Sequence, residues 1–391
     1  MSDPINVFVI AGEPSGDRLG AALLTGLNAE ANVEITGVGG PLMEAAGLRS
    51  LFPMSDLAVM GLMEVLPRIP KILRRVRQTA AAIRAVKPDV LITIDSPDFC
   101  LRVAKRVRYD LPNMPVVHYV APSVWAWRPE RAEKMARHVD HVLALLPFEP
   151  PYMEKAGLSC DFVGHPVVGT KTPTKPQIQS FRDQNRADTL LAVLPGSRRG
   201  EVKRMLPIFA DVVHALAAEG RSLRAVIPTV IGSEALVRTM TADWSVPITY
   251  VHQSDGDDWD RRKQIAIGAS DAALLMSGTV SLEVAAVGCP QVVAFKVNKA
   301  TTRMLKRMLL IDTGTLVNIL TDTRDIPEAM LENATPEVIL GFLRPLLDDP
   351  GRAKTQKETA ARALRLLHPP EAHAAAKSVL RFLSKRPETS R

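Results

Sequence analysis

The chain has 391 residues, of which 46% are hydrophobic and 23% charged, and no repeat or low-complexity tract occurs, which excludes a disordered, fibrous or solenoid protein. Its length exceeds what one hydrophobic core usually serves and predicts two domains. The net charge of +7 favours anionic partners, but the low aromatic content and the lack of zinc-finger, RNP-like or helix-turn-helix patterns argue against nucleic acid.

The cysteines and the N-terminal residues favour a location in the reducing cytoplasm. Cys100, Cys160 and Cys289 are scattered without CxxC spacing, and the first residues lack the features of a secretory signal. No segment approaches the length of about 20 uninterrupted apolar residues that a spanning helix needs. We therefore expect a cytoplasmic protein whose membrane contact is peripheral.

Strand-like runs alternate with helical stretches along both halves of the chain, which predicts βαβ units and two parallel sheets with helices on both faces. Together the two domains are expected to face a cleft. The expected strands are 5–12, 33–40, 89–95, 114–120, 141–146 and 160–165, then 189–195, 223–230, 247–253, 271–276 and 291–297.

A stretch rich in proline and lysine divides the two series and predicts an interdomain linker at 169–177. The domains then cover 1–168 and 178–365. From 336 onward the pattern is helical, and periodicity leaves open whether a terminal helix at about 366–391 packs on the first domain.

The first strand runs into AGEPSGD, a glycine-containing turn before a helix. Glu13 and Asp17 would repel a pyrophosphate, so sugar hydroxyls suit this turn better, with Ser15 and Gly16 at the helix start. The alternative is a tight turn with exposed acids.

IDSPD places Asp95 at the end of a buried strand and Asp98 three residues on. The carboxyl ends of parallel strands open into the ligand crevice, and a general base must lie within reach of the hydroxyl that it deprotonates. Asp95 is the preferred base and Asp98 its partner, although the sequence does not decide between them. An ordinary capped turn is the alternative.

HYVAPSVWAWRP carries Trp125 and Arg128 in a loop before a basic helix. An amphipathic ring beside an arginine suits a sugar or acyl-phosphate surface, whereas core packing of the tryptophan is the rival interpretation.

Two further strand-turn-helix segments, LPGSRRGEV and MSGTVSLE, predict the site of an anionic, nucleotide-like ligand. A pyrophosphate would be held by backbone N–H groups, hydroxyls and a guanidinium. A carboxylate one turn into the second helix would accept hydrogen bonds from a ribose. The residues are Gly196, Ser197 and Arg198, then Ser277, Gly278, Thr279 and Glu283. We expect no cofactor or metal, since neither a DxD motif nor a histidine cluster accompanies them.

The segment 60–84 combines apolar residues with nearby cations, as anionic bilayers and acylated substrates attract. A core helix with a solvated basic face is the alternative. The candidate acyl-contacting residues are Met60, Leu62, Met63, Val65, Leu66, Ile69 and Ile72.

Taken together, AGEPSGD, GVGGPLM, IDSPDFC, HYVAPSVWAWRPERA, FVGHPV, LPGSRRGEV and SDAALLMSGTVSLEVA resemble the lipid-A-disaccharide synthase family, inverting glycosyltransferases of GT-B architecture. The resemblance implies transfer from UDP-2,3-diacylglucosamine to the 6-hydroxyl of 2,3-diacylglucosamine 1-phosphate at the inner face of the cytoplasmic membrane, giving a β-1,6 disaccharide and UDP. It also implies that Asn318 meets the nucleotide. The chain departs from the family's pattern at Val317, where proline is usual, and at Cys100, where asparagine is common.

Two rival functions stay open at this point. One is another GT-B enzyme that acts on UDP-N-acetylglucosamine with a soluble acceptor, and the other is a non-enzymatic protein of the membrane surface. The sequence leaves open whether the chain forms a homodimer.

Overall fold

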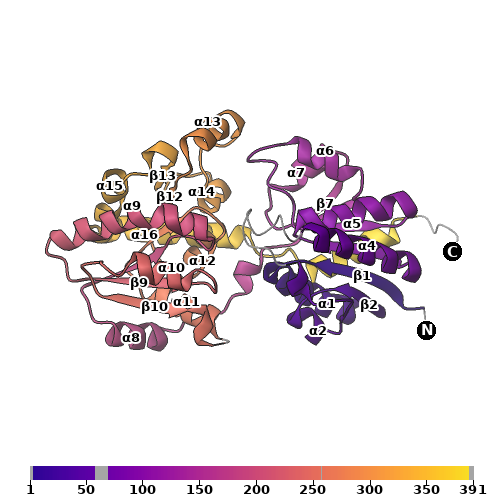
Figure 1. Ribbon diagram of the computed structural model, residues 1–391, viewed down its shortest axis with the longest axis horizontal. Helices are drawn as coiled ribbons and strands as arrows, with labels where there is room; N and C mark the ends of the chain where they lie inside the picture. The colour runs from indigo at the N-terminus through magenta and orange to yellow at the C-terminus, as the bar shows by residue number, and fades with distance from the viewer. Residues whose placement is uncertain (1–2, 58–68, 257, 387–391) are drawn as a thin grey trace. The chain divides into compact units, whose positions relative to one another are not determined.

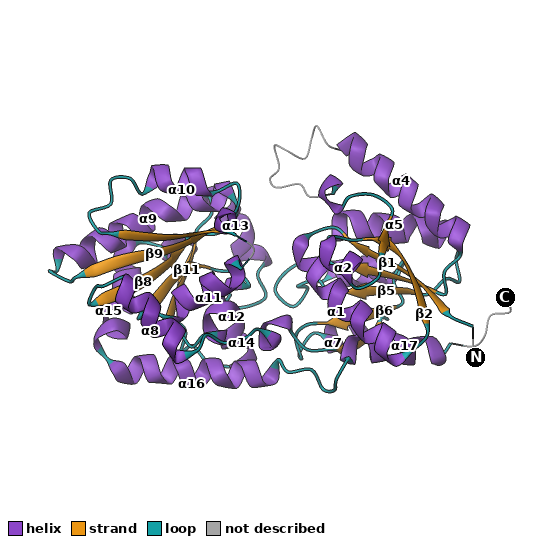
Figure 2. Cartoon of the chain, turned by 90° about the horizontal axis from the view of Figure 1, so that it is seen from below, coloured by secondary structure: helices purple, strands orange, loops and turns teal. Residues whose placement is uncertain are grey.

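The computed structural model describes residues 3–57, 69–256 and 258–386. The chain divides into two compact units, each built around one parallel sheet (Figures 1 and 2). The first unit comprises Met1–Pro166 and Leu367–Arg391, and the second comprises Val167–Leu366.

The sheet of the first unit has seven strands in the order β3-β2-β1-β4-β5-β6-β7, all paired in parallel. Its central strands are apolar on both faces because helices cover both sides; all five residues of β4 are buried. The strands are β1 (Ile5–Ala11), β2 (Val33–Val38), β3 (Arg49–Ser50), β4 (Val90–Ile94), β5 (Val116–Tyr119), β6 (His141–Ala144) and β7 (Ser159–Phe162).

Two hydrophobic cores lie on the two faces of this sheet, one built with α1 and α17 and the other with α4 and α5 (Figure 2). The helices are α1 (Pro14–Glu30), α2 (Pro41–Ala45), α4 (Ile69–Val86), α5 (Pro97–Asp110), α6 (Glu130–Ala136), α7 (Pro150–Glu154) and α17 (Ala374–Ser384), with a 3-10 turn at Met54–Asp56.

The last helix, α17, belongs to the first unit although the 200 residues of the second unit precede it. Ala376 and Val379 are buried beside α1, and the Ser378 hydroxyl lies 2.8 Å from Nε2 of His141 on β6. The ring of Phe382 stacks on His141 with centroids 5.0 Å apart. Burial of this apolar face therefore fixes the path of the C-terminal helix, which periodicity alone left open.

The second unit repeats the design with six strands in the order β10-β9-β8-β11-β12-β13, again all parallel. The strands are β8 (Thr189–Leu194), β9 (Leu223–Thr229), β10 (Ile248–His252), β11 (Ala272–Met276), β12 (Gln291–Phe295) and β13 (Glu328–Met330). The sequence pattern found the first five of these and missed β13, which is only three residues long.

Helices α9 and α15 cover one face of the second sheet, and α8 and α11 cover the other. The helices are α8 (Lys175–Gln184), α9 (Arg199–Ala218), α10 (Glu234–Met240), α11 (Trp259–Gly268), α12 (Val280–Ala286), α13 (Lys299–Met308), α14 (Leu316–Thr321), α15 (Pro336–Asp348) and α16 (Pro350–Leu366). Short 3-10 turns occupy Pro166–Gly169, Gln253–Asp255 and Leu331–Asn333.

Helix α8 begins at Lys175, inside the stretch expected to be a linker without helix or strand. Thr174 and Gln177 form a capping box at its start, and a proline in the first turn costs no hydrogen bond because the first N–H groups of a helix have no partner within it. Local capping therefore outweighs the proline-rich composition here.

Candidate functional site

In the first unit the strand order reverses between β1 and β4, so the turns that follow these strands lie side by side. A Cβ placed on Gly12 would lie 2.7 Å from the Oγ of Ser96, closer than real Cβ contacts come. Gly16 also packs on the end of β4, where an added Cβ would meet the Ile94 carbonyl oxygen at 3.4 Å, an ordinary van der Waals distance. The small residues of AGEPSGD thus allow α1 to begin directly against the end of β4.

Asp95 lies at this meeting point, half-buried at the end of β4. Its Oδ2 accepts a hydrogen bond of 3.3 Å from the Ser15 hydroxyl. Asp95 and Ser96 both adopt left-handed backbone angles, with φ of 51° and 42°, which non-glycine residues rarely hold. The strained turn aims the Asp95 carboxylate across the sheet edge towards the start of α1.

Asp98 sits in the first turn of α5 and is exposed. Glu13 is the N-cap residue of α1 and is likewise exposed, and no side-chain capping bond forms there. Both carboxylates are accessible at the same edge of the sheet as Asp95, since each follows a strand that ends there.

Asp17 has a structural role that its assignment to the acceptor did not foresee. The residue is 3% exposed, and its carboxylate accepts hydrogen bonds from the backbone N–H groups of Gly40, Leu42 and Met43 at 2.9, 3.1 and 3.0 Å. These donors lie at the start of α2, where a negative charge is favourable. The carboxylate is therefore committed to joining α1 to α2, and we correct the assignment.

Trp125 follows the rival interpretation, core packing. The ring is buried, meets Phe148 edge-on at 5.2 Å, and donates from Nε1 to Oε1 of Glu149 at 3.2 Å. Burial raises the pKa of Glu149 to about 7, partly offset by bonds from Leu146 and Trp125. Trp125 therefore stabilises the loop after β5, and its ring is not open to stack on a sugar.

Arg128 lies farther along the same loop, half-buried and with a left-handed φ of 52°. Its guanidinium stacks over the ring of Trp127 at 4.5 Å. The aromatic residue that contacts Arg128 is thus Trp127 and not Trp125.

The candidate acyl-contacting segment is described only in part. Ile69 is 38% exposed at the start of α4, whereas Ile72 is partly buried against the core of the first unit. Lys71 and Arg75 both pair with Asp56. Met60, Leu62, Met63, Val65 and Leu66 lie outside the described residues.

The second unit has the same arrangement at its own reversal of strand order, between β8 and β11. Gly196, with φ of 112°, turns the chain after β8, and a Cβ there would lie 3.0 Å from Sδ of Met276, the last residue of β11. The turns 195–198 and 277–279 therefore adjoin, and both lead into helix N-termini, which favour anions.

One carboxylate already occupies part of this anion-binding surface. Oε2 of Glu201 accepts from the backbone N–H groups of Ser197 and Arg198, both at 3.1 Å, and Oε1 pairs with the Arg198 guanidinium at 2.8 Å. Sequence reasoning overlooked Glu201, although a glutamate three residues after a helix N-cap is a recognised capping signal. The N–H groups assigned to the pyrophosphate are thus engaged internally.

The second turn is more open. Gly278 and Thr279 are exposed, and no side-chain bond from Thr279 caps α12. The Ser277 hydroxyl lies 3.5 Å from the Gly314 carbonyl oxygen. This turn leaves the start of α12 accessible to a ligand.

Glu283 forms an ion pair with Lys263, with 2.6 Å between Oε2 and Nζ. Lys263 is nearly buried, and its ammonium lies 4.4 Å from the centre of the Trp259 ring. The Glu283 side chain remains 41% exposed, so one face can still accept from a hydroxyl. No local signal marked Lys263, because it comes from a different helix.

The sequence comparisons with known proteins agree on one family. A sequence profile described as "Lipid-A-disaccharide synthetase" matches residues 7–382. The lipid-A-disaccharide synthase of Ruegeria pomeroyi is 50% identical over 352 residues, which cover 88% of this chain and 87% of that protein. That of Rhodospirillum centenum is 43% identical over 391 residues, covering 98% and 96%.

The chain belongs to the lipid-A-disaccharide synthase family. Among solved structures it resembles the UDP complex of Staphylococcus aureus MnaA, with a TM-score of 0.63, 13% identity and full coverage of both chains. It also resembles UDP-GlcNAc 2-epimerase from Neisseria meningitidis, with a TM-score of 0.64, 12% identity and coverage of 98% and 99%. At such low identity the likeness concerns the fold alone, which is of GT-B type.

The resemblance to the family implies that Asn318 contacts the nucleotide. The residue is fully buried, and its amide donates to the Ile326 carbonyl at 2.8 Å and accepts from the Ile326 N–H at 3.1 Å. The side chain therefore closes the loop after α14, and we correct its assignment as a ligand contact.

The two departures from the family's pattern are also internal. Val317 lies in the first turn of α14 and is fully buried. Cys100 is also fully buried, near the ends of β1 and β4. Its sulfur lies 3.9 Å from the Ile10 carbonyl oxygen and 3.7 Å from that of Ile94. Burial raises the pKa of the Cys100 thiol. Neither side chain is placed to contact a substrate.

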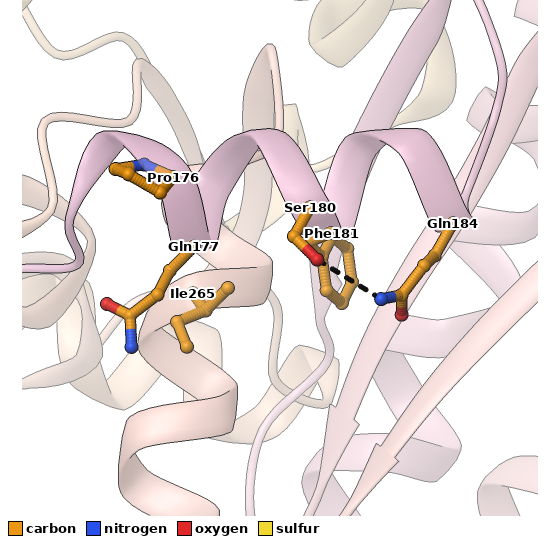
Figure 3. A pocket seen from close by; sticks show the side chains of 6 residues that line it. All are labelled: Pro176, Gln177, Ser180, Phe181, Gln184 and Ile265. Atoms are coloured by element: carbon orange, nitrogen blue, oxygen red, sulfur yellow. Dashed lines mark hydrogen bonds between the residues drawn. The ribbon is translucent and has the colours of Figure 1, made fainter.

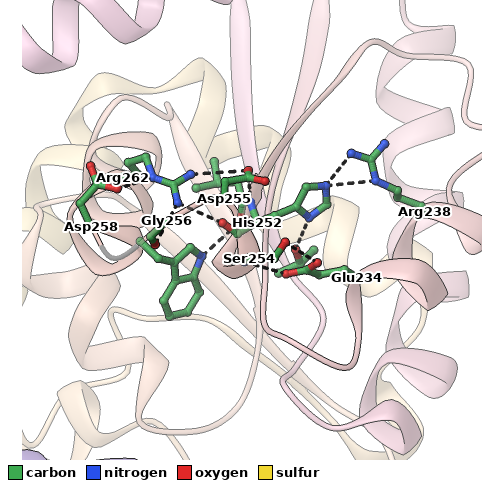
Figure 4. A network of polar contacts seen from close by, with 11 residues as sticks. Glu234, Arg238, His252, Ser254, Asp255, Gly256, Asp258 and Arg262 are labelled. Atoms are coloured by element: carbon green, nitrogen blue, oxygen red, sulfur yellow. Dashed lines mark hydrogen bonds and ion pairs between the residues drawn. The ribbon is translucent and has the colours of Figure 1, made fainter. Parts of the chain in front are cut away.

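A polar network at the end of β10 borders the same edge of the second sheet (Figure 4). His252 Nε2 lies 2.7 Å from an Arg238 guanidinium nitrogen, and Nδ1 lies 2.6 Å from the Thr229 hydroxyl. An arginine only donates, so His252 accepts at Nε2 and carries its proton at Nδ1. Glu234 accepts from Ser254, which ties the loop after β10 to α10.

A groove beside α8 and α11 is lined by Pro176, Gln177, Ser180, Phe181, Gln184 and Ile265 (Figure 3). Ser180 and Gln184 bond to each other across 3.2 Å. None of these lining side chains is charged, so the groove does not suit a pyrophosphate.

Among the residues that the structure describes, no group of three or more His, Cys, Asp or Glu side chains is arranged to hold a metal ion. No described helix is both long and apolar enough to span a bilayer.

Proposed function

We propose that the chain transfers the diacylglucosamine of UDP-2,3-diacylglucosamine to the 6-hydroxyl of 2,3-diacylglucosamine 1-phosphate, giving the β-1,6-linked lipid A disaccharide 1-phosphate and UDP. The observation that carries the proposal is the family match from residue 7 to residue 382. The placement of reactive residues at the strand-order reversal of each unit supports it, because ligands of open α/β sheets bind there.

In the proposed reaction Asp95 is the general base. Its carboxylate takes the proton of the acceptor hydroxyl while that oxygen forms a bond to the anomeric carbon of the donor. The bond from this carbon to the phosphate oxygen breaks on the opposite face, which inverts the configuration and releases UDP. The bond from Ser15 to Asp95 and the rigid strand end support this role, since a base must be held in position.

The second unit is proposed to hold the UDP portion of the donor. Arg198 and the N-termini of α9 and α12 would stabilise the charge that develops on the leaving pyrophosphate. Ser277, Gly278 and Thr279 offer an open turn, and the exposed side of Glu283 would accept from a ribose hydroxyl. The chemistry of these donors and acceptors supports a nucleoside diphosphate.

The first unit is proposed to hold the acceptor, with Glu13, Ser15 and Arg128 near its sugar. Peripheral association with the inner face of the cytoplasmic membrane, through the 60–72 segment, would bring the acyl chains to this unit. The partial exposure of Ile69 and the cations of α4 support this contact.

The test is a mass-spectrometric assay of purified protein with the two diacylated substrates. Disaccharide and UDP in equal amounts are expected. Formation of product from UDP-N-acetylglucosamine and a soluble acceptor, without disaccharide from the acylated pair, would favour the alternative GT-B enzyme. Isothermal titration with UDP separates both enzymes from a non-enzymatic membrane protein, for which no saturable heat is expected.

A further inference from the structure

Helix α13, Lys299–Met308, exposes most of its length at the periphery of the second unit (Figure 1). Of its described side chains, those of residues 301–308, only Thr302 is buried. Met304 is 45% exposed, and Leu309 and Leu310, just beyond the helix, are 37% and 61% exposed. Large apolar side chains of α13 and of the two residues after it therefore face solvent.

The start of α13 is capped by local hydrogen bonds. The Asn298 side chain caps it by accepting from the Thr301 N–H at 2.8 Å, and the Thr302 hydroxyl donates to the Asn298 carbonyl at 3.1 Å. Capping fixes the residue at which the helix begins.

The exposed face is also cationic. Arg303, Met304, Arg307 and Met308 line a shallow hollow, with the arginines and the methionines each one turn apart. The sequence of α13, KATTRMLKRM, contains no acidic residue. Lys306 pairs with Glu332 at 2.8 Å, which offsets its charge, so the positive charge of this face comes from Arg303 and Arg307.

We infer that α13 and the two leucines after it form a second membrane-docking surface, which binds anionic lipid headgroups and inserts its apolar side chains at the acyl boundary. Neighbouring arginines and exposed Met and Leu side chains suit such a surface, because cations attract the headgroups while apolar groups gain from leaving water. A nucleic-acid partner is less suited to this face, since α13 has no aromatic residue for base stacking.

This surface lies on the second unit and is distinct from the 60–72 segment of the first. The inference rests on the proposed function in one respect: an acylated donor resides in the bilayer, so the unit that holds its nucleotide must lie close to the membrane. Binding to lipid is measured separately from disaccharide formation, so either can fail without the other.

The test is co-sedimentation of the full chain with vesicles of phosphatidylcholine alone or of phosphatidylcholine and phosphatidylglycerol in equal parts. Met304→Ser, Leu309→Ser and Leu310→Ser are combined in one variant, and Arg303→Gln and Arg307→Gln in another. The matched control combines Leu42→Ser, Ile231→Ser and Leu366→Ser, which remove equally exposed apolar side chains elsewhere.

We expect each α13 variant to bind the anionic vesicles about tenfold more weakly than the parent chain, and the control to bind as the parent does. The arginine variant should also lose most of the parent's sensitivity to salt. Unchanged binding of both α13 variants, or an equal loss in the control, would overturn the inference. UDP binding, measured by titration, should be unchanged in all variants and thereby shows that they fold.

Discussion

The Ser15 hydroxyl donates to Oδ2 of Asp95 over 3.3 Å and so joins the N-terminus of α1 to the end of β4. The two residues are 80 positions apart in the chain, yet the parallel pairing of β1 with β4 brings them together. This bond leaves Oδ1 of Asp95 available at the sheet edge. A carboxylate held in this way supports the proposal that Asp95 is the base.

Asp95→Asn should lower disaccharide formation by about 10²- to 10⁴-fold, the usual contribution of a positioned general base. The amide keeps the size of the side chain but cannot take the proton. UDP binding, measured by calorimetry, should be retained, because Asp95 lies in the first unit. Asp98→Asn is the matched comparison; if it were the more damaging change while Asp95→Asn stayed active, Asp98 would be the base.

Glu201→Gln should tighten UDP binding by a few-fold. The carboxylate now accepts from the Ser197 and Arg198 N–H groups and pairs with the Arg198 guanidinium, so it competes with a phosphate for the same donors. Glutamine keeps an acceptor but removes the charge. Calorimetric titration with UDP measures the effect; weaker binding would show instead that the ionised glutamate prepares the turn.

Asp17→Ala should destabilise the protein by about 3 kcal/mol, because it leaves buried N–H groups at the start of α2 without their acceptor. Urea denaturation measures the free energy of unfolding. Glu13→Ala, at an exposed position of the same turn, is the control and should change stability less than Asp17→Ala. A stable Asp17→Ala protein without activity would restore a direct role in substrate binding.

Glu149 should make stability depend on pH. Its folded-state pKa is raised from 4.5 to about 7 by burial, so the native state holds the proton more tightly than the unfolded chain. The resulting stabilisation is complete below pH 4.5 and is lost as the pH rises through 7, by about 3 kcal/mol at most. Glu149→Gln cannot ionise and should lack this part of the pH dependence of unfolding. Parallel curves for the two proteins from pH 4.5 to 8 would contradict the assignment.

Local sequence determined most of the elements and the edge of each sheet where the candidate site residues lie. Apolar runs such as TLLAVL predicted buried parallel strands, and the turns after β1, β4, β8 and β11 were marked by small and polar residues. These signals are readable because strand burial and helix capping depend on neighbours along the chain.

The partners of each polar side chain were decided only by the tertiary structure. In the sequence, Asp17 and Asp95 both lie where a strand gives way to a helix. In the structure, however, Asp17 is buried against α2 and Asp95 lies at the sheet edge. Asn318 likewise bonds to a residue eight positions away, inside the loop. Hydrogen bonding in a folded chain depends on which groups the packing brings within about 3 Å, and composition and spacing carry no direct record of that distance.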